Sequence, residues 1–115
     1  MQPDIVTLNV GGTRFMTLRS TLLCICDTFF AALVRADPLA TEYFVDRDPT
    51  HFRHVLNWLR GVHRLPEHSD ILRELEHEAD YYNIAGMVAF TRGARGLSML
   101  HLMQGIETTL RHKNV

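Results

Sequence analysis

The sequence has little of several features that mark specialised classes of protein. Only two of its 115 residues are cysteines, Cys24 and Cys26, and they lie two positions apart. Such close spacing rarely suits a structural disulfide, so we expect two reduced thiols in a cytoplasmic protein. No apolar stretch reaches the roughly 18–20 residues that cross a bilayer, and the N-terminus lacks the pattern of a signal peptide. We therefore expect no direct membrane insertion.

An excess of charge of either sign is also missing. Twelve Lys and Arg residues stand against 13 Asp and Glu residues, which gives a net charge of −1. Because a phosphate-binding surface normally shows as a basic excess, we expect no nucleic acid partner. The apolar content of 46% is ordinary for a globular protein, and the length suits one folded domain.

Groups that would perform chemistry are not arranged for it. The pair Gly11–Gly12 lacks the Gly-Lys-Ser/Thr that completes a phosphate loop, and nothing marks Cys24 or Cys26 as a nucleophile. His51 and His54 lie one turn apart, but no carboxylate or thiol is placed to complete a metal site. The sequence therefore predicts no enzyme, no cofactor and no bound metal.

The N-terminal residues show the pattern of a β-hairpin. Val6, Leu8 and Val10 alternate with polar residues, as in a half-buried strand. The Gly11–Gly12 pair that follows supplies the positive backbone angles of a tight reversal. We therefore expect residues 14–18 to return as the partner strand.

Two short helices are expected next. Either Ser20 or Thr21 can cap a first helical turn, and either Asp27 or Thr28 can cap a second helix. The second helix should end at Asp37–Pro38, because the residue before a proline disfavours helical geometry.

The middle of the chain predicts a strand and then a well-marked helix. Glu42–Val45 is typical of a short strand. Asp48 can cap the next helix, with Pro49 at its first position, where a missing N–H costs nothing. Gly61 is placed to stop this helix. One apolar stripe follows the helical period, at Phe52, Val55, Leu56 and Leu59.

The C-terminal part predicts further helices. A helix is expected from about Ser69 to Tyr82 and another over Ile84–Thr91, interrupted by glycines at positions 93 and 96. We place the domain at residues 1–92 and treat 93–115 as a helical extension. Its amphipathic segment Leu97–Leu110 is too short for an independent coiled coil, so docking on its own domain is an equal alternative.

Four sequence blocks, in order and at matching spacing, resemble one family. They read NVGGTRFMT at Asn9–Thr17, TLLCICDTFF at Thr21–Phe30, FVDRDPTHFRHVLNWLRG at Phe44–Gly61 and LEHEADYYNI at Leu75–Ile84. Together they resemble the potassium-channel-tetramerisation branch of the BTB/POZ superfamily. The resemblance implies an α/β (α+β) fold, with a small mixed sheet and an N-terminal hairpin packed by a cluster of helices.

The resemblance also implies self-association into a ring. Assembly domains of voltage-gated potassium channels form tetramers, whereas many soluble KCTD-type proteins form pentamers and recruit a cullin ubiquitin-ligase scaffold. The motif FVDRDP, followed by FRHVLNWLR, resembles the KCTD type more closely than the channel type. We therefore expect a homo-tetramer or homo-pentamer that acts as a cullin adaptor; a channel assembly domain and a scaffold without cullin are the alternatives. No cysteine follows Tyr82, so the interface zinc of many channel domains is not expected.

Polar residues beyond the needs of a small monomer are the candidates for the subunit interface. Complementary charges at such a contact fix register and partner choice. Local roles in the hairpin, the turn and the helix cap are the alternative reading for each. The candidates are Asn9, Arg14, Thr17, Arg19, Asp46, Arg47 and Asp48.

Apolar residues of the second helix, with the loop after it, form the candidate edge for a cullin. Aromatic side chains are strong anchors when they fill a partner's pocket. Adjacent aromatic residues on a helix cannot face the same way, so we expect most of them in the core. The candidates are Phe29, Phe30, Leu33, Val34, Arg35 and Tyr82.

Overall fold

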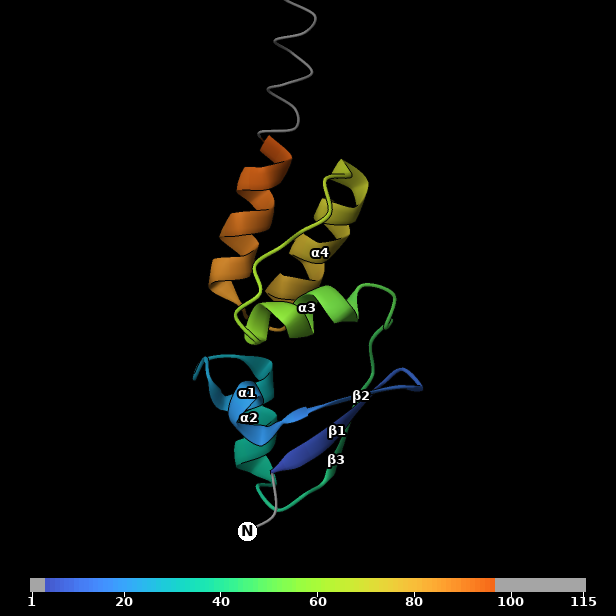
Figure 1. The fold of residues 1–115 in the computed structure, drawn as a ribbon, viewed down its shortest axis with the longest axis vertical. Helices are drawn as coiled ribbons and strands as arrows, with labels where there is room; N and C mark the ends of the chain where they lie inside the picture. Colours follow the sequence, from blue (N-terminus) through green and yellow to red (C-terminus); the bar gives the residue numbers. More distant parts are fainter. Residues whose placement is uncertain (1–3, 97–115) are drawn as a thin grey trace, which may run out of the picture.

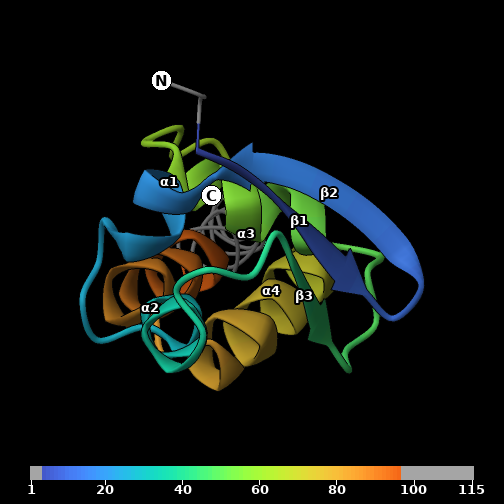
Figure 2. The same ribbon diagram turned by 90° about the horizontal axis from the view of Figure 1, so that it is seen from below.

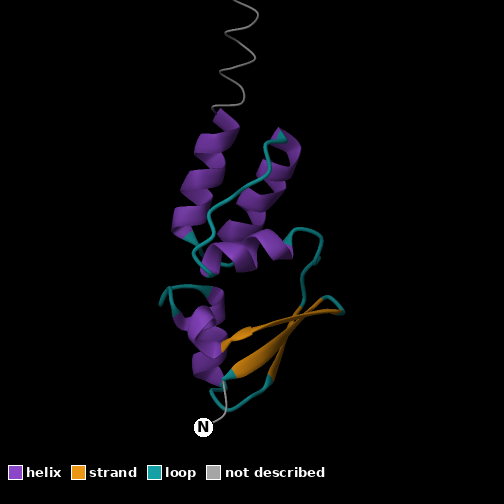
Figure 3. Ribbon diagram, in the orientation of Figure 1, coloured by secondary structure: helices purple, strands orange, loops and turns teal. Residues whose placement is uncertain are grey.

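A computed structural model describes residues 4–96 of the chain, which form a small sheet with helices packed against it (Figures 1 and 3). The strands are β1 (Ile5–Val10), β2 (Thr13–Leu18) and β3 (Glu42–Val45). The helices are α1 (Arg19–Leu23), α2 (Phe29–Ala36), α3 (Phe52–Leu59), α4 (Ser69–Tyr81) and a further helix over residues 85–96. The expected α/β architecture is confirmed.

The sheet is mixed and has the order β2-β1-β3. β1 and β2 are antiparallel and join through Gly11 and Gly12, whose φ angles are 56° and 102°. β3 lies parallel to β1 on the other side, with Leu8 opposite Tyr43. Both the hairpin and the strand at Glu42–Val45 are confirmed.

Helices cover one face of the sheet only. In Figure 2 the described helices lie to one side of the three strands, and none lies beyond the opposite face. The helix-facing positions Val6, Leu8 and Val10 of β1 are buried, and so are Tyr43 and Val45 of β3. Within residues 4–96, no helix covers the outward positions of the strands.

An aromatic cluster joins the helices under the sheet. The Phe30 ring of α2 stacks on the Tyr82 ring at the end of α4, with 4.5 Å between centroids. The Phe52 ring of α3 lies 5.8 Å from Phe30 and 5.7 Å from Tyr82. All three side chains are almost fully buried, so three helices share one core.

The cap of α2 is Thr28, one of the two residues that the sequence offered. The Thr28 hydroxyl accepts a hydrogen bond from the Ala31 N–H at 3.2 Å, and the helix ends before Asp37. α3 ends before Gly61, which has a φ of 86°. Small polar caps and glycine stops of this kind act within a few residues, which is why sequence patterns locate them.

Two other helix starts were predicted wrongly. Neither Ser20 nor Thr21 caps α1: the helix follows β2 directly, and the Arg19 N–H donates to the Asp4 carbonyl at 2.8 Å. α3 begins at Phe52 rather than Pro49, and its N-cap position is His51. Asp48 instead accepts the Thr50 N–H at 2.8 Å and so closes the turn before the helix.

The predicted break at Gly93 is also wrong, because the last described helix runs through it to residue 96. Its arginines reach across to α4: Arg92 lies 3.3 Å and Arg95 3.2 Å from the carboxylate of Glu76. A glycine inside a helix costs about 1 kcal/mol relative to alanine, and this helix tolerates that cost. The predicted segment Leu97–Leu110 lies outside the described residues. None of the helices within residues 4–96 is both long and apolar enough to cross a bilayer.

We predict that Gly11→Ala destabilises the domain. A Cβ at this position would lie 2.4 Å from the Arg47 carbonyl oxygen, and the positive φ adds strain. We expect a loss of roughly 1–3 kcal/mol in the free energy of unfolding, measured by urea titration at one protein concentration. The control is Gly93→Ala, where the added Cβ meets nothing within 4 Å and should be neutral or stabilising. Wild-type stability in Gly11→Ala would show that the hairpin tip does not need this close approach.

Candidate functional site

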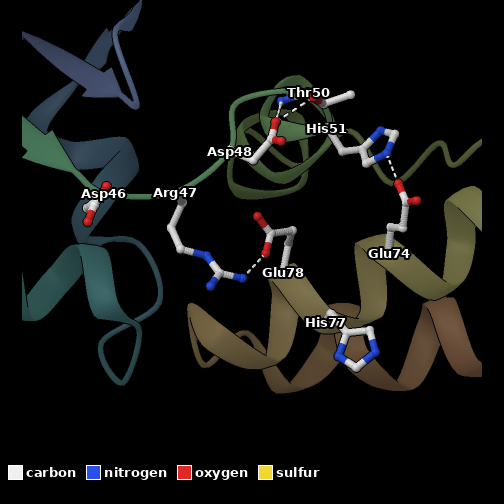
Figure 4. Close-up of a pocket in the computed structure, with 8 residues that line it drawn as sticks. All are labelled: Asp46, Arg47, Asp48, Thr50, His51, Glu74, His77 and Glu78. Carbon is white, nitrogen blue, oxygen red and sulfur yellow. Dashed lines mark hydrogen bonds and ion pairs between the residues drawn. The ribbon is translucent and has the colours of Figure 1, made fainter.

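The loop between β3 and α3 faces α4 across a groove of about 680 Å³, which we call the acidic groove. Figure 4 shows the loop residues on one side and the α4 residues on the other. Four of the lining side chains carry a carboxyl group and only one carries a guanidinium. The groove is lined by Asp46, Arg47, Asp48, Thr50, His51, Glu74, His77 and Glu78.

Arg47 is partly buried and has partners within the chain. Its guanidinium is ion-paired with Glu78 of α4 and lies 4.1 Å from the centre of the Tyr81 ring (Figure 4 shows the ion pair). The hydrogen bond to Glu78 raises the pKa of Arg47 above its ordinary value. Arg47 therefore ties the loop to α4, whatever it does at a subunit contact.

Asp48 and His51 also have partners within the chain. The Asp48 carboxylate accepts hydrogen bonds from the backbone N–H and the hydroxyl of Thr50, which lower its pKa. The His51 Nε2 is paired with Glu74. Asp46, by contrast, is exposed and makes no hydrogen bond or ion pair within the described part of the chain; in Figure 4 it lies apart from the paired residues.

The interface candidates on the hairpin divide into local and open residues. The Asn9 side-chain oxygen accepts the Gly12 N–H at 2.9 Å, and Thr17 is buried on the inner face of β2. Arg14 is 65% exposed and donates to Glu42 at 2.8 Å. The local reading thus accounts for Asn9 and Thr17, while Arg14 remains open to a partner.

Arg19 ties the start of α1 to the strands. It donates to Asp4 at 2.9 Å, to the Tyr43 hydroxyl at 2.7 Å and to the Ala40 carbonyl at 3.0 Å. Its side chain is only 14% exposed. The structure therefore favours a local role for Arg19. Among the interface candidates, Arg14 and Asp46 stay largely exposed and available to a partner.

The predicted cullin edge needs correction. Phe30, Val34 and Tyr82 are buried with relative exposures of 0%, 2% and 0%, so their assignment to a partner surface is wrong. Phe30 and Tyr82 stack on each other in the aromatic cluster, and Val34 lies one helical turn after Phe30 in the same core. Phe29 and Leu33 are half-buried at the rim of that core.

Two residues near the C-terminal end of α2 are exposed on the predicted edge. Arg35 is exposed and donates to the Cys26 carbonyl at 2.9 Å. Leu39, in the loop between α2 and β3, is 89% exposed. The revised edge consists of Phe29, Leu33, Arg35 and Leu39.

The outward face of the sheet carries an apolar surface that the sequence analysis did not predict. Large apolar side chains stand at outward positions on all three strands, with exposures of 45%, 63%, 46% and 61%. A sheet face in water usually carries polar residues at these positions. The sequence does contain a sign of this surface. The strands TRFMTL and EYFV carry apolar residues at alternating positions on both faces of the sheet, not on one face only. We call the outer sheet face the set Ile5, Met16, Leu18 and Phe44.

We predict that the Arg47–Glu78 pair contributes measurably to stability. Arg47→Met leaves Glu78, whose side chain is 14% exposed, without its partner among other carboxylates. We expect a loss of roughly 1–2 kcal/mol in the free energy of unfolding, and a double variant with Glu78→Gln that loses less than the sum. The control is Arg92→Met, whose side chain is 65% exposed and should cost less than about 0.5 kcal/mol. Additive losses in a urea double-mutant cycle would contradict the coupling.

Comparison with known proteins identifies the family of this sequence. Residues 6–90 match the family model described as BTB/POZ domain. Human BTB/POZ domain-containing protein KCTD3 is 44% identical over 90 residues, covering 74% of this chain and 11% of that protein. Bovine SH3KBP1-binding protein 1 is 41% identical over 97 residues, covering 74% of this chain and 13% of that protein.

A third relative is shorter. Human BTB/POZ domain-containing protein KCTD5 is 40% identical over 95 residues, covering 76% of this chain and 40% of that protein. The chain thus spans less than half the length of each of these relatives. Since the family model covers residues 6–90 and these relatives match about three quarters of the chain, the chain belongs to the BTB/POZ family, in its potassium-channel-tetramerisation branch with the KCTD-type proteins.

Proposed function

We propose that this chain is a self-assembling BTB/POZ interaction domain, and that its assembly serves as an adaptor that presents a substrate to a cullin ubiquitin ligase. The observation that carries the proposal is the family match over residues 6–90, together with named KCTD relatives about 40% identical. A domain of this kind works through surfaces rather than through a catalytic centre.

Self-assembly is supported by the surfaces of the single chain. The outer sheet face exposes four large apolar side chains, and burying such residues against another copy removes apolar area from water. Arg14 and Asp46 add exposed charges of opposite sign close to the sheet. Charges of that kind select register and partner in an oligomer.

The cullin part of the proposal is supported by the revised edge on α2 and its following loop. Phe29 and Leu33 offer partly exposed apolar surface, and Leu39 projects from the loop. Exposed apolar side chains of this kind can serve as anchors that fill a partner's pocket. This edge is formed by different elements from the outer sheet face, so assembly and cullin binding can occur together.

We predict that the purified chain is a closed homo-oligomer. Native mass spectrometry at tens of micromolar should show a tetramer or a pentamer, without a ladder of larger species, because a ring contact closes on itself. A pentamer would agree with the KCTD-type reading, and a tetramer with a channel-type assembly domain. A monomer at this concentration would refute self-assembly.

We also predict that cullin binding depends on Leu39. Titration calorimetry against a panel of cullin N-terminal domains should reveal one binder, and Leu39→Ser should weaken it about tenfold or more. Leu39→Ser should leave the oligomer intact, since the side chain is 89% exposed. A matched control is Val62→Ser, at an exposed apolar residue in the loop after α3. Absence of binding to every cullin would leave a scaffold without cullin as the function.

A further inference from the structure

We propose that Tyr81 is a site of tyrosine phosphorylation, and that its phosphate weakens binding at the revised cullin edge. The inference rests on the proposed adaptor function and names a regulation of that same edge. A tyrosine kinase catalyses the step and ATP supplies the phosphate. The Tyr81 hydroxyl oxygen attacks the γ-phosphorus, the bond from that phosphorus to the β–γ bridging oxygen breaks, ADP leaves, and the hydroxyl proton passes to the base of the kinase.

Tyr81 is the one tyrosine that the folded domain offers to a kinase. The sequence holds three tyrosines, and all of them lie within the described residues. Tyr82 is fully buried in the aromatic cluster. Tyr43 is 5% exposed, and its hydroxyl is hydrogen-bonded to Arg19 and to the Asp37 carbonyl. Tyr81 is 45% exposed, so exposure selects it over the other two.

Tyr81 also stands at the end of an element. It is the last residue of α4, and Asn83 has a φ of 58°, which ends the helical geometry. Helix ends fray, so the backbone opens more readily here than in the middle of α4. Tyr82 holds the next position in the core. The folded chain should therefore be modified more slowly than a free peptide of the same sequence.

The residues before Tyr81 carry the charge that many tyrosine kinases prefer. Such kinases bind their substrates through a basic surface, which complements carboxylates on the N-terminal side of the tyrosine. Carboxylates stand one, three and five positions before Tyr81, on Asp80, Glu78 and Glu76. The local sequence therefore suits an acid-directed kinase.

Arg47 lies where it can hold the phosphate. Its guanidinium carbon is 4.1 Å from the centre of the Tyr81 ring, and its one ion pair within the described residues is with Glu78. The Arg47 Nε is buried and has no hydrogen-bond partner among those residues. Arginine binds phosphate through paired donors, and the phosphate of a phosphotyrosine carries about −1.5 to −2 charges at pH 7. The phosphate would therefore compete with Glu78 for this guanidinium.

The phosphate would also lie beside the revised cullin edge. The centroids of the Tyr81 and Phe29 rings are 5.6 Å apart, and Phe29 belongs to that edge. An apolar contact at Phe29 removes its surroundings from water. Taking a charged phosphate out of water is costly. Phosphorylation of Tyr81 should therefore weaken a partner that docks on Phe29.

The first test asks whether the folded chain accepts the phosphate. The full chain is incubated with ATP and a panel of purified tyrosine kinases, and the product is mapped by mass spectrometry. We expect phosphate on Tyr81 alone and none on the Tyr81→Phe variant. Tyr82→Phe is the matched control: it removes a buried hydroxyl that has no partner among the described residues, so it should be labelled like the wild type.

A synthetic peptide of residues 74–88 shows which kinases recognise the sequence. A kinase that labels Tyr81 in the peptide but not in the folded chain would overturn the proposal, because the fold then hides the site. Phosphate on Tyr43 or Tyr82 in place of Tyr81 would also overturn it. So would a panel in which no kinase labels the peptide.

The second test asks whether Arg47 holds the phosphate. The chain phosphorylated at Tyr81 is titrated by phosphorus NMR, beside the same product in the Arg47→Met background. A paired guanidinium favours the doubly charged phosphate, so the second pKa of the phosphate should be lower in the wild type than in the variant. Equal titration curves would show that Arg47 does not contact the phosphate.

The third test concerns the regulation. Titration calorimetry with the cullin domain that the unmodified chain binds should give a dissociation constant about tenfold or more higher for the chain phosphorylated at Tyr81. Unchanged affinity would overturn the regulation while the adaptor function stands. If the unmodified chain binds no cullin, the adaptor function fails and the regulation with it. The labelling test still decides in that case whether Tyr81 is a phosphorylation site.

Discussion

The packing of Phe30, Phe52 and Tyr82 is the interaction on which the rest of this domain depends. These rings come from α2, α3 and the end of α4, and their centroids lie within 6 Å of one another. Burial of this cluster fixes α4 relative to the sheet, and with it the position of Glu74 and Glu78 opposite the β3–α3 loop. Aromatic residues contribute this much because each removes a large apolar area from water and packs at defined angles. The groove is thus a consequence of the core.

The charged residues between β3 and α3 fall into two groups, those with partners inside the chain and those that are exposed. Arg47 and Asp48 hold the loop in place, one through Glu78 and Tyr81 and the other through Thr50. The tip of the β1–β2 hairpin packs against this loop. Gly11 lies so close to the Arg47 carbonyl that a Cβ would not fit. Asp46 takes no part in this local network and faces outward. A run of three charged residues therefore contains both fold-stabilising and surface positions.

The functional proposal rests on surfaces that a stable monomer does not need. An outward sheet position costs nothing when it is polar, whereas an exposed Phe44 or Met16 leaves apolar area in water. In a BTB/POZ domain such area is most economically explained by another protein chain. Assembly and adaptor function would then use different faces of one small fold.

Patterns within a few neighbouring residues were enough to predict most of the local elements. The Gly11–Gly12 reversal, a cap at Asp27 or Thr28 and the strand at Glu42–Val45 depend on residues close together in the chain, so sequence patterns could predict them. The sequence patterns failed where distant residues take part: the Asp4 carbonyl accepts the first N–H of α1, and the last described helix, whose Arg92 contacts α4, runs through Gly93. The same reason explains the candidate site. Only the tertiary structure showed that Phe30, Val34 and Tyr82 are core, that Arg19 and Arg47 are satisfied internally, and that the sheet keeps an apolar face open. Burial is a property of what packs against a residue, and that partner is usually far away in the sequence.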